Sequence, residues 1–170
     1  RRLDRIEKLA EELRDAHKVE AHAHAVDVTD RERVAGYVET LERLDLLPDV
    51  LVTNAGKARG LDKLHEGSIE DWEEMIDTNL KGVLYMSRAI LPHMVSRNSG
   101  HVVHIGSTAG RWVYPKGAVY NASKFGLRAI AEGMSMDLLG TTVRVSSVDP
   151  GLTETEFSEV RCHGDTDRAA

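Results

Sequence analysis

Short runs rich in Val, Leu and Ile alternate along this chain with longer stretches of helical spacing. The short runs span residues 19–28, 49–53, 101–105 and 142–148, and the helical stretches span 3–13, 29–44, 117–138 and 68–97, the last interrupted near Pro92. Strands that alternate with helices are joined by right-handed crossovers, so the strands lie parallel and helices cover both faces of the sheet. We therefore expect an α/β fold with a doubly wound parallel sheet.

The composition fits one core and excludes several kinds of partner. With 170 residues, 41% of them hydrophobic, the chain can bury a single core. Its formal net charge of −6 gives no general attraction to nucleic acid or to an anionic membrane, and no apolar run is long enough to cross a bilayer. The one cysteine, Cys162, cannot form an internal disulfide. We expect a cytoplasmic protein without nucleic-acid or membrane partners.

Polar and turn-forming residues follow each of the expected strands. Asp27, Asn54 and Ser107 each come at the end of a run, and Pro150-Gly151 follows the last one. Ligands of open parallel sheets collect at the carboxyl ends of the strands. These residues are therefore expected to surround one ligand site.

Tyr120 and Lys124 stand four residues apart near the start of a helical stretch, thirteen residues after Ser107. Side chains at this spacing share one helix face, so the ammonium of Lys124 can favour the ionised form of the phenol. A tyrosine with its ordinary pKa of about 10 is a poor base near neutral pH, and such a neighbour would make proton transfer easier. Alone, the pair is equally typical of a solvated helix face.

The order and spacing of these residues strongly resemble those of the short-chain dehydrogenase/reductase family, over residues 1–164. The matching residues are Asn54-Ala55-Gly56, Asn79, Ser107, Tyr120, Lys124 and Pro150-Gly151. The resemblance implies a Rossmann-type sheet, a nicotinamide cofactor and a catalytic tetrad of Asn79, Ser107, Tyr120 and Lys124. Tyr120 would exchange the hydroxyl proton during hydride transfer, and Ser107 would orient the substrate oxygen. Asn79 would anchor a water beside Lys124, although an asparagine in mid-helix is also typical of a local kink.

The choice of cofactor depends on Arg1 and Arg2, which match the end of the family's second strand, beside the adenosine ribose. A guanidinium there can pair with a 2′-phosphate, which favours NADP over NAD, although two arginines at a helix start can also be plain surface residues. The other cofactor-binding residues implied by the resemblance are Asp27, Val28, Asn54, Ala55, Gly56, Tyr120, Lys124, Pro150, Gly151 and Thr153. One mild departure is Thr53, which stands where the family usually has an asparagine.

A larger departure is that the family's glycine-rich loop, its first two strands and its C-terminal part have no counterpart in this sequence. That loop normally cradles the pyrophosphate of the dinucleotide. We expect residues 1–170 to be a single Rossmann-type domain that is incomplete at both ends.

The segments around the expected site look like those of the NADP-dependent 3-hydroxy acid dehydrogenases, also called serine dehydrogenases or malonic semialdehyde reductases. The matching segments are 105–110, 112, 114–115, 156–158, 160–161 and 164–165. A small hydroxy acid or carbonyl substrate would then contact Ser107, Trp112, Tyr120 and Arg161, with Arg111 as an alternative partner for a carboxylate. His22 and His24 share a strand face but lack a third ligand, so no metal site is expected.

Two other functions share parts of this pattern. A reductase of ketones linked to an acyl carrier protein would use the same tetrad, and a non-catalytic dinucleotide-binding module would need only the fold. The helices near residues 68 and 117 build dimers and tetramers in the family, and they carry extra apolar residues, including Leu127, Ile130 and Met134. A homo-oligomer, either a dimer or a homotetramer, is therefore expected.

Overall fold

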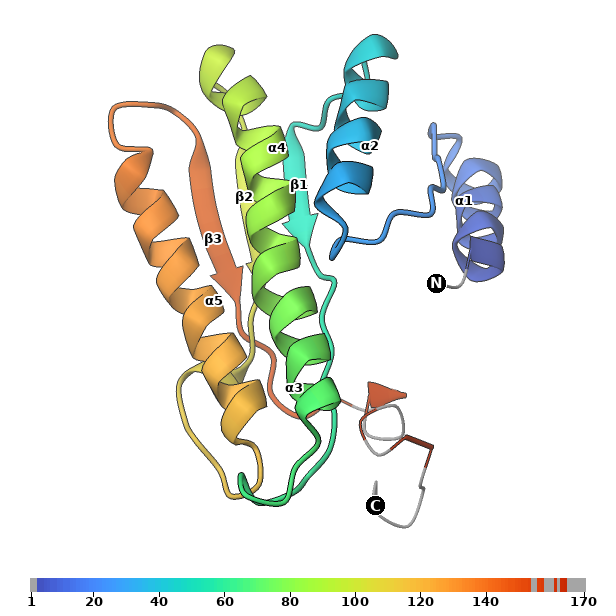
Figure 1. The fold of residues 1–170 in the computed structure, drawn as a ribbon. Helices are drawn as coiled ribbons and strands as arrows, with labels where there is room; N and C mark the ends of the chain where they lie inside the picture. The colour runs from blue at the N-terminus through green and yellow to red at the C-terminus, as the bar shows by residue number, and fades with distance from the viewer. Residues whose placement is uncertain (1–2, 154–155, 158–160, 162, 165–170) are drawn as a thin grey trace.

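The centre of the computed structural model is a three-stranded parallel sheet (Figure 1). Strands β1 (Val50–Thr53), β2 (His101–Ile105) and β3 (Arg144–Val148) lie in the order β1-β2-β3. Residues 3–153, 156–157, 161 and 163–164 are described by the structure. The expected α/β class with a parallel sheet is confirmed, and β2 has the predicted bounds.

Helices occupy most of the chain between the strands. They are α1 (Leu3–His17), α2 (Arg31–Arg43), α3 (Ile69–Ile76), the π-helical turn η1 (Asp77–Lys81), α4 (Gly82–Ser96), the 3-10 turn η2 (Thr108–Gly110) and α5 (Ala118–Asp137). The Asp30 side chain caps α2, and the Ser68 side chain caps α3 by accepting from a backbone N–H. These capping residues explain why the helices begin where the sequence pattern predicts.

The predicted interruption near Pro92 is wrong. Pro92 lies inside α4, which continues to Ser96. A proline removes one backbone hydrogen bond, but Ile90 and Met94 on either side of it are 2% and 0% exposed, and their burial keeps the helix in place. The irregular turn lies instead at Asp77–Lys81, between α3 and α4.

One face of the sheet packs against α4 and α5, and this contact forms the main core. Alternate residues of a strand point to opposite faces, so Val102 and His104 on β2 both point toward the helices and are 0% exposed. The fully or nearly buried apolar residues of this core are Val38, Ile90, Met94, Val102, Met134, Leu138 and Val143. Helix α2 joins it through Val38.

The opposite face of the sheet is only partly covered in the part of the chain that the structure describes. Val50 and Val52 of β1 are each 52% exposed, and Val148 of β3 is 51% exposed. The helices of Figure 1 that pack on the sheet lie on its other side. The expected coverage of both faces is therefore not present among these residues, although the strand sequences have the apolar character of a covered sheet.

The predicted strand at residues 19–28 is wrong. This segment has no regular structure and connects α1 to α2, and α1 stands apart from the sheet (Figure 1). A strand exists only through hydrogen bonds to a neighbour, and β1 pairs with β2 alone among the described strands. The alternating sequence pattern is thus present without a pairing partner.

Two of the residues that suggested an oligomer interface lie in the interior of the chain itself. Leu127 is 2% exposed and Met134 is 8% exposed, while Ile130 packs against the main core. Their apolar character is explained by packing of α5 on the sheet, so they no longer indicate an interface. In the described ranges, no helix combines the length and apolar character that a bilayer span requires.

Neighbouring positions on α4 allow a test of this core. We expect Met94→Ala to lower the free energy of unfolding by about 2–5 kcal/mol, because Met94 is 0% exposed and its loss leaves a cavity. The control is Val95→Ala, at a side chain that is 41% exposed, which should change stability by less than about 0.5 kcal/mol. Urea unfolding measures both, and equal effects would show that α4 does not pack as described.

His104 makes stability depend on pH. Its Nδ1 lies 2.7 Å from Thr53 Oγ1, its Nε2 has no partner among the described residues, and burial lowers its pKa below 6.5. Above pH 6.5 the ring is neutral whether the chain is folded or not. As the pH falls below 6.5, the unfolded chain binds a proton that the folded chain resists, so the free energy of unfolding should fall by up to about 1.4 kcal/mol per pH unit.

Denaturant unfolding between pH 7.5 and 5 measures this pH dependence of the free energy of unfolding. The His104→Gln variant should lose this part of the pH dependence, whereas His65→Gln, at a side chain that is 75% exposed, should keep it. If both variants follow the wild type, His104 does not carry the effect.

Candidate active site

The candidate site lies where β1, β2 and β3 end at the same edge of the sheet. The loops after β2 and β3 run together there, since Thr108 N donates to Pro150 O at 3.0 Å. A β-carbon on Gly106 would collide with the Asp149 carboxylate, so any larger residue there would require that side chain to shift. This arrangement brings Ser107 next to the start of α5.

Helix α5 presents Tyr120 and Lys124 to this edge, one turn apart on the same face. They are 7% and 8% exposed, so the pair is not on a solvated helix face. Lys124 Nζ donates to Ile105 O at 3.0 Å and lies 6.0 Å from the centre of the Tyr120 ring. The Ser107 side chain accepts from Ala109 N at 3.1 Å and lies close enough to Tyr120 to lower the pKa of its phenol. Three of the four predicted tetrad residues therefore meet at the end of β2.

Asn79 lies in the π-helical turn η1 and is 1% exposed. Its Oδ1 accepts from Lys57 N at 2.8 Å, and its Nδ2 donates to Lys57 O at 2.8 Å and to Ser123 Oγ at 2.9 Å. These bonds join the loop after β1 to α5 rather than capping the helix that contains Asn79. Single π turns of this kind are frequent at functional sites.

Gly56 connects the cofactor residues expected after β1 to this cluster. A β-carbon placed on Gly56 would lie 3.6 Å from Asn79 Oδ1 and 3.7 Å from Lys124 Nζ. The direction in which a Gly56 side chain would point is therefore toward two of the predicted tetrad residues.

Burial shifts the two titratable groups of the cluster away from their charged forms. It lowers the pKa of Lys124 to about 8, partly offset by the negative charge of Asp149. It raises the pKa of Tyr120, and the nearby phenol of Tyr114 adds to this, while the hydrogen bond with Ser107 and the positive charge of Arg161 act in the opposite direction. The sequence-based expectation of a lowered tyrosine pKa through Lys124 is thus not met in this structure, because desolvation is the largest effect.

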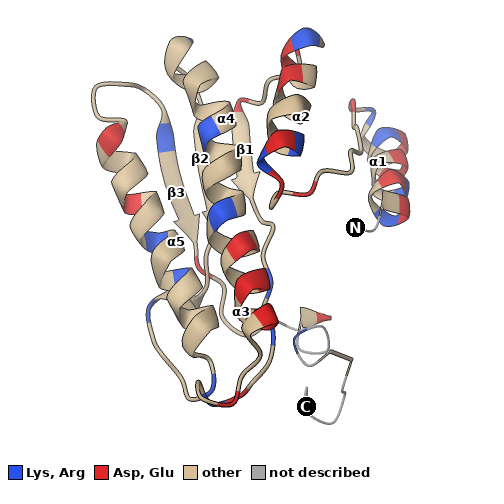
Figure 2. Ribbon diagram, in the orientation of Figure 1, with Lys and Arg blue, Asp and Glu red and all other residues tan. Residues whose placement is uncertain are grey.

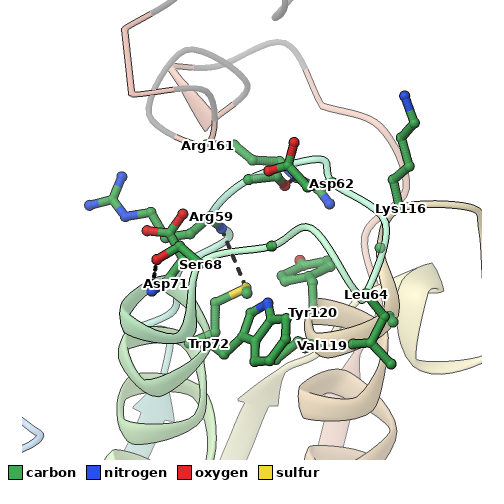
Figure 3. Close-up of a pocket in the computed structure, with 15 residues that line it drawn as sticks. Arg59, Asp62, Leu64, Ser68, Asp71, Trp72, Lys116, Val119, Tyr120 and Arg161 are labelled. Atoms are coloured by element: carbon green, nitrogen blue, oxygen red, sulfur yellow. Dashed lines mark hydrogen bonds between the residues drawn. The ribbon is translucent and has the colours of Figure 1, made fainter.

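A cavity opens above Tyr120, between α3 and the start of α5 (Figure 3). Trp72 and Val119 lie on one side of it and Arg161 and Asp62 on the opposite side, and Met75 also lines it. Trp72 and Met75 are three residues apart on α3, so they share one helix face. This spacing is the signal by which the sequence could have indicated them.

The prediction that Trp112 lines the substrate site stays untested, and the structure places its indole elsewhere. Trp112 is 63% exposed and is not among the residues around the Tyr120 cavity. The reason is local: its backbone carbonyl accepts from Asn121 Nδ2 at 2.9 Å, which fixes the loop with the side chain directed outward. Trp72 occupies the place in the cavity that the sequence suggested for Trp112.

Of the two candidate arginines, only Arg161 reaches the cavity. Its Nη1 donates to the Tyr114 hydroxyl at 2.8 Å, and its guanidinium lies 5.4 Å from the centre of the Tyr120 ring. Arg111 instead forms an ion pair with Asp149, with its Nη2 2.6 Å from the carboxylate.

A second cavity, of about 380 Å³, lies beside the loop after β1. It brings together four predicted cofactor residues, Asp27, Val28, Ala55 and Gly56, with Ala25, Val26, Arg33, Lys57 and Thr78. Asn54 borders an adjoining crevice, and Pro150, Gly151 and Thr153 are exposed after β3. Arg1 and Arg2, on which the choice of NADP depended, lie outside the described residues.

The loop after β1 is fastened to α3 by two ion pairs that the sequence did not suggest. Glu74 accepts from Lys57 Nζ and, at 2.6 Å, from Arg59 Nε. Figure 2 shows that α3 presents several acidic residues along its length, of which Glu74 faces this loop. Lys57 and Arg59 are 13% and 15% exposed, which makes these pairs less screened than surface ones.

The chain is similar to known proteins of one enzyme family. The model of the short chain dehydrogenase family matches residues 1–164. An NADP-dependent 3-hydroxy acid dehydrogenase YdfG from Shigella flexneri is 46% identical over 170 residues, which are 99% of this chain and 67% of that protein. An NADP-dependent 3-hydroxy acid dehydrogenase from Schizosaccharomyces pombe is 40% identical over 99% of this chain and 65% of its own length.

Solved structures of dehydrogenases are also similar to this chain. The closed form of a serine dehydrogenase complexed with NADP+ matches with a TM-score of 0.88 and 45% identity, over 95% of this chain and 66% of the other. An alcohol dehydrogenase from Thermococcus sibiricus matches with a TM-score of 0.85 and 30% identity, over 94% and 66%. The chain thus spans about two thirds of the length of these relatives. Since the family model matches nearly all of it, the chain belongs to the short-chain dehydrogenase family.

Proposed function

We propose that the protein is an oxidoreductase that transfers hydride between NADP(H) and a small hydroxy acid or the corresponding carbonyl compound. The observation that carries this proposal is the meeting of Ser107, Tyr120 and Lys124 at the end of β2, beside a small cavity above the phenol. The substrate class is supported by the relatives at 46% and 40% identity, which are NADP-dependent 3-hydroxy acid dehydrogenases. The relatives named above do not favour a reductase of carrier-bound ketones or a non-catalytic module.

In the proposed mechanism, Tyr120 is the general acid/base. During reduction its hydroxyl gives a proton to the substrate oxygen, and during oxidation the phenolate takes that proton back. Ser107, whose hydroxyl acts on the pKa of Tyr120, orients the same oxygen and stabilises the charge that develops on it. Lys124, with a pKa of about 8, holds an exchangeable proton next to the phenol. Asn79 fixes the loop after β1 against α5, so that these groups keep their positions.

The cavity beside the loop after β1 fits the adenosine half of a dinucleotide. It combines a carboxylate, Asp27, with the apolar side chains of Val26 and Val28 and with Gly56, where the backbone can approach a ligand closely. The residues proposed to hold the cofactor are Asp27, Val28, Asn54, Ala55, Gly56, Tyr120, Lys124, Pro150, Gly151 and Thr153, with Arg1 and Arg2 at the 2′-phosphate. When bound, the nicotinamide supplies or accepts the hydride.

Three broader features belong to this proposal. Residues 1–170 are assigned to a single Rossmann-type domain, because α2, α4, α5 and the sheet share one core. A homo-oligomer, in particular a homotetramer, is proposed on the outer faces of α4 and α5, where Leu84 and Phe125 are 47% and 40% exposed. A cytoplasmic location is proposed from the single cysteine of the chain.

The proton-transfer assignment is tested by Tyr120→Phe in the full-length protein. We expect kcat for reduction of a small aldehyde to fall by about 10²–10⁴-fold, because the proton donor is lost. Binding of NADPH, measured by its fluorescence, should persist. Tyr85→Phe, which removes a phenol hydroxyl from α4 instead, should leave kcat within about twofold. Near-normal turnover by Tyr120→Phe would show that another group transfers the proton.

The cofactor and substrate are tested by comparing NADPH with NADH in the reduction of malonic semialdehyde, and by the reverse reaction with 3-hydroxy acids. We expect kcat/KM to be at least about tenfold higher with NADPH, because a guanidinium pairs with the 2′-phosphate. Arg2→Gln should reduce this preference, while Lys8→Gln on α1 should not. Equal use of NADH would overturn the assignment of NADP without affecting the assignment of the reaction.

A further inference from the structure

Two described residues near the C-terminal end, Phe157 and Arg161, lie against the ring of Tyr120. The Phe157 ring lies 5.9 Å from the Tyr120 ring, at an angle of 59°, and the Arg161 guanidinium lies 5.4 Å from the centre of the same ring. Figure 3 shows Arg161 on the side of the cavity that faces the phenol. These contacts help to reduce the exposure of Tyr120 to 7%.

The guanidinium of Arg161 is held firmly above the phenol. Its Nε donates to Gly60 O at 2.9 Å, its Nη1 donates to the Tyr114 hydroxyl at 2.8 Å, and its own carbonyl accepts from Gly60 N at 3.0 Å. The side chain also lies 5.5 Å from the Tyr114 ring, and the residue is 9% exposed. A charge with this many partners and so little solvent contact acts strongly on its neighbours.

The other charged groups near Tyr120 are engaged elsewhere. Lys124 donates to Ile105 O and lies 6.0 Å from the ring centre, farther than Arg161. Asp71, at the rim of the cavity, pairs with His163 at 3.0 Å, and Asp62 also borders the cavity.

Behind Lys124, Asp149 pairs with Arg111. The remaining cations that border the cavity are Arg59, which pairs with Glu74, and Lys116, which points away from the phenol in Figure 3. Among the described groups, Arg161 is therefore the fixed positive charge on the face of the Tyr120 ring.

We propose that Arg161 is a positioning residue for proton transfer, whose guanidinium stabilises the Tyr120 phenolate. The proposal rests on the function given above and assigns Arg161 a role that does not require a substrate carboxylate. Two neighbours act on the phenol in opposite directions. Burial beside Phe157 disfavours the phenolate, and the positive charge of Arg161 offsets this. Arg161 lowers the pKa of Tyr120, which is the direction expected if its charge stabilises the phenolate.

The pH profile of the oxidation reaction tests this inference, because oxidation needs the phenolate. The full-length wild type, Arg161→Met and Arg161→Lys are compared with two substrates, a 3-hydroxy acid and a neutral alcohol of similar size. We expect the acid limb of the kcat profile to move upward by about one pH unit in Arg161→Met with both substrates. Arg161→Lys, which keeps the charge, should recover at least half of that shift. Lys63→Met, which removes a charge from an exposed loop, should leave the profile unchanged.

A second measurement does not depend on turnover. Ionisation of tyrosines is followed by ultraviolet difference absorbance in the wild type and in Arg161→Met. Each titration is compared with that of the same chain carrying Tyr120→Phe, and the difference between the two is the signal of Tyr120. Ionisation of Tyr120 should move to higher pH in Arg161→Met. Thermal unfolding of each variant establishes that it is folded.

Two outcomes would overturn the inference. One is a pH profile and a tyrosinate titration that do not move in Arg161→Met. The other is a rise in KM confined to the 3-hydroxy acid with an unchanged profile, which would show that Arg161 binds the substrate carboxylate instead. Neither outcome affects the proposed function, which fails only if the wild type oxidises neither substrate with NADP+.

Discussion

The buried amide of Asn79 makes the contacts on which the rest of the candidate site depends. Its three hydrogen bonds tie the backbone of Lys57, after β1, to Ser123 on α5. The loop after β1 carries the residues proposed to hold the cofactor, and α5 carries Tyr120 and Lys124. Because a buried amide must satisfy both its donors and its acceptor, loss of any one partner would be costly. The cofactor crevice and the proton-transfer groups are therefore held in a fixed relation by one side chain.

Burial and charge act against each other at this site. Removing Tyr120 and Lys124 from water favours the neutral form of each, which raises the pKa of the phenol and lowers that of the amine. The fixed partners then decide how far each shift goes: Ser107 and Arg161 for the phenol, Asp149 for the amine. Burial by itself brings the pKa of Lys124 closer to neutral pH, whereas the pKa of Tyr120 is moved in that direction only by partners such as Ser107 and Arg161. The positive charge that acts on the Tyr120 phenol belongs to Arg161, which is distant from Tyr120 in the sequence.

Several elements could be predicted because their signals are local. The Asp30 and Ser68 caps, the helical spacing of α5 and the apolar run of β2 depend on neighbours a few residues away. The segment at 19–28 has an equally local strand pattern but no pairing partner among the described strands, so the pattern alone was insufficient. Trp112 and Trp72 show the same limit, because an aromatic in a loop gives no sign of which way it points.

By itself, the sequence determined the parallel α/β class, because order and spacing along the chain are sufficient for it, and through the family resemblance it predicted a tetrad of Asn79, Ser107, Tyr120 and Lys124. Only the tertiary structure decided the protonation balance of Tyr120. That balance depends on burial and on the distance to Arg161, which is 41 residues away along the chain but 5.4 Å from the ring. Desolvation and Coulomb interactions are functions of distance in space, and no pattern of residue types along a chain contains that distance.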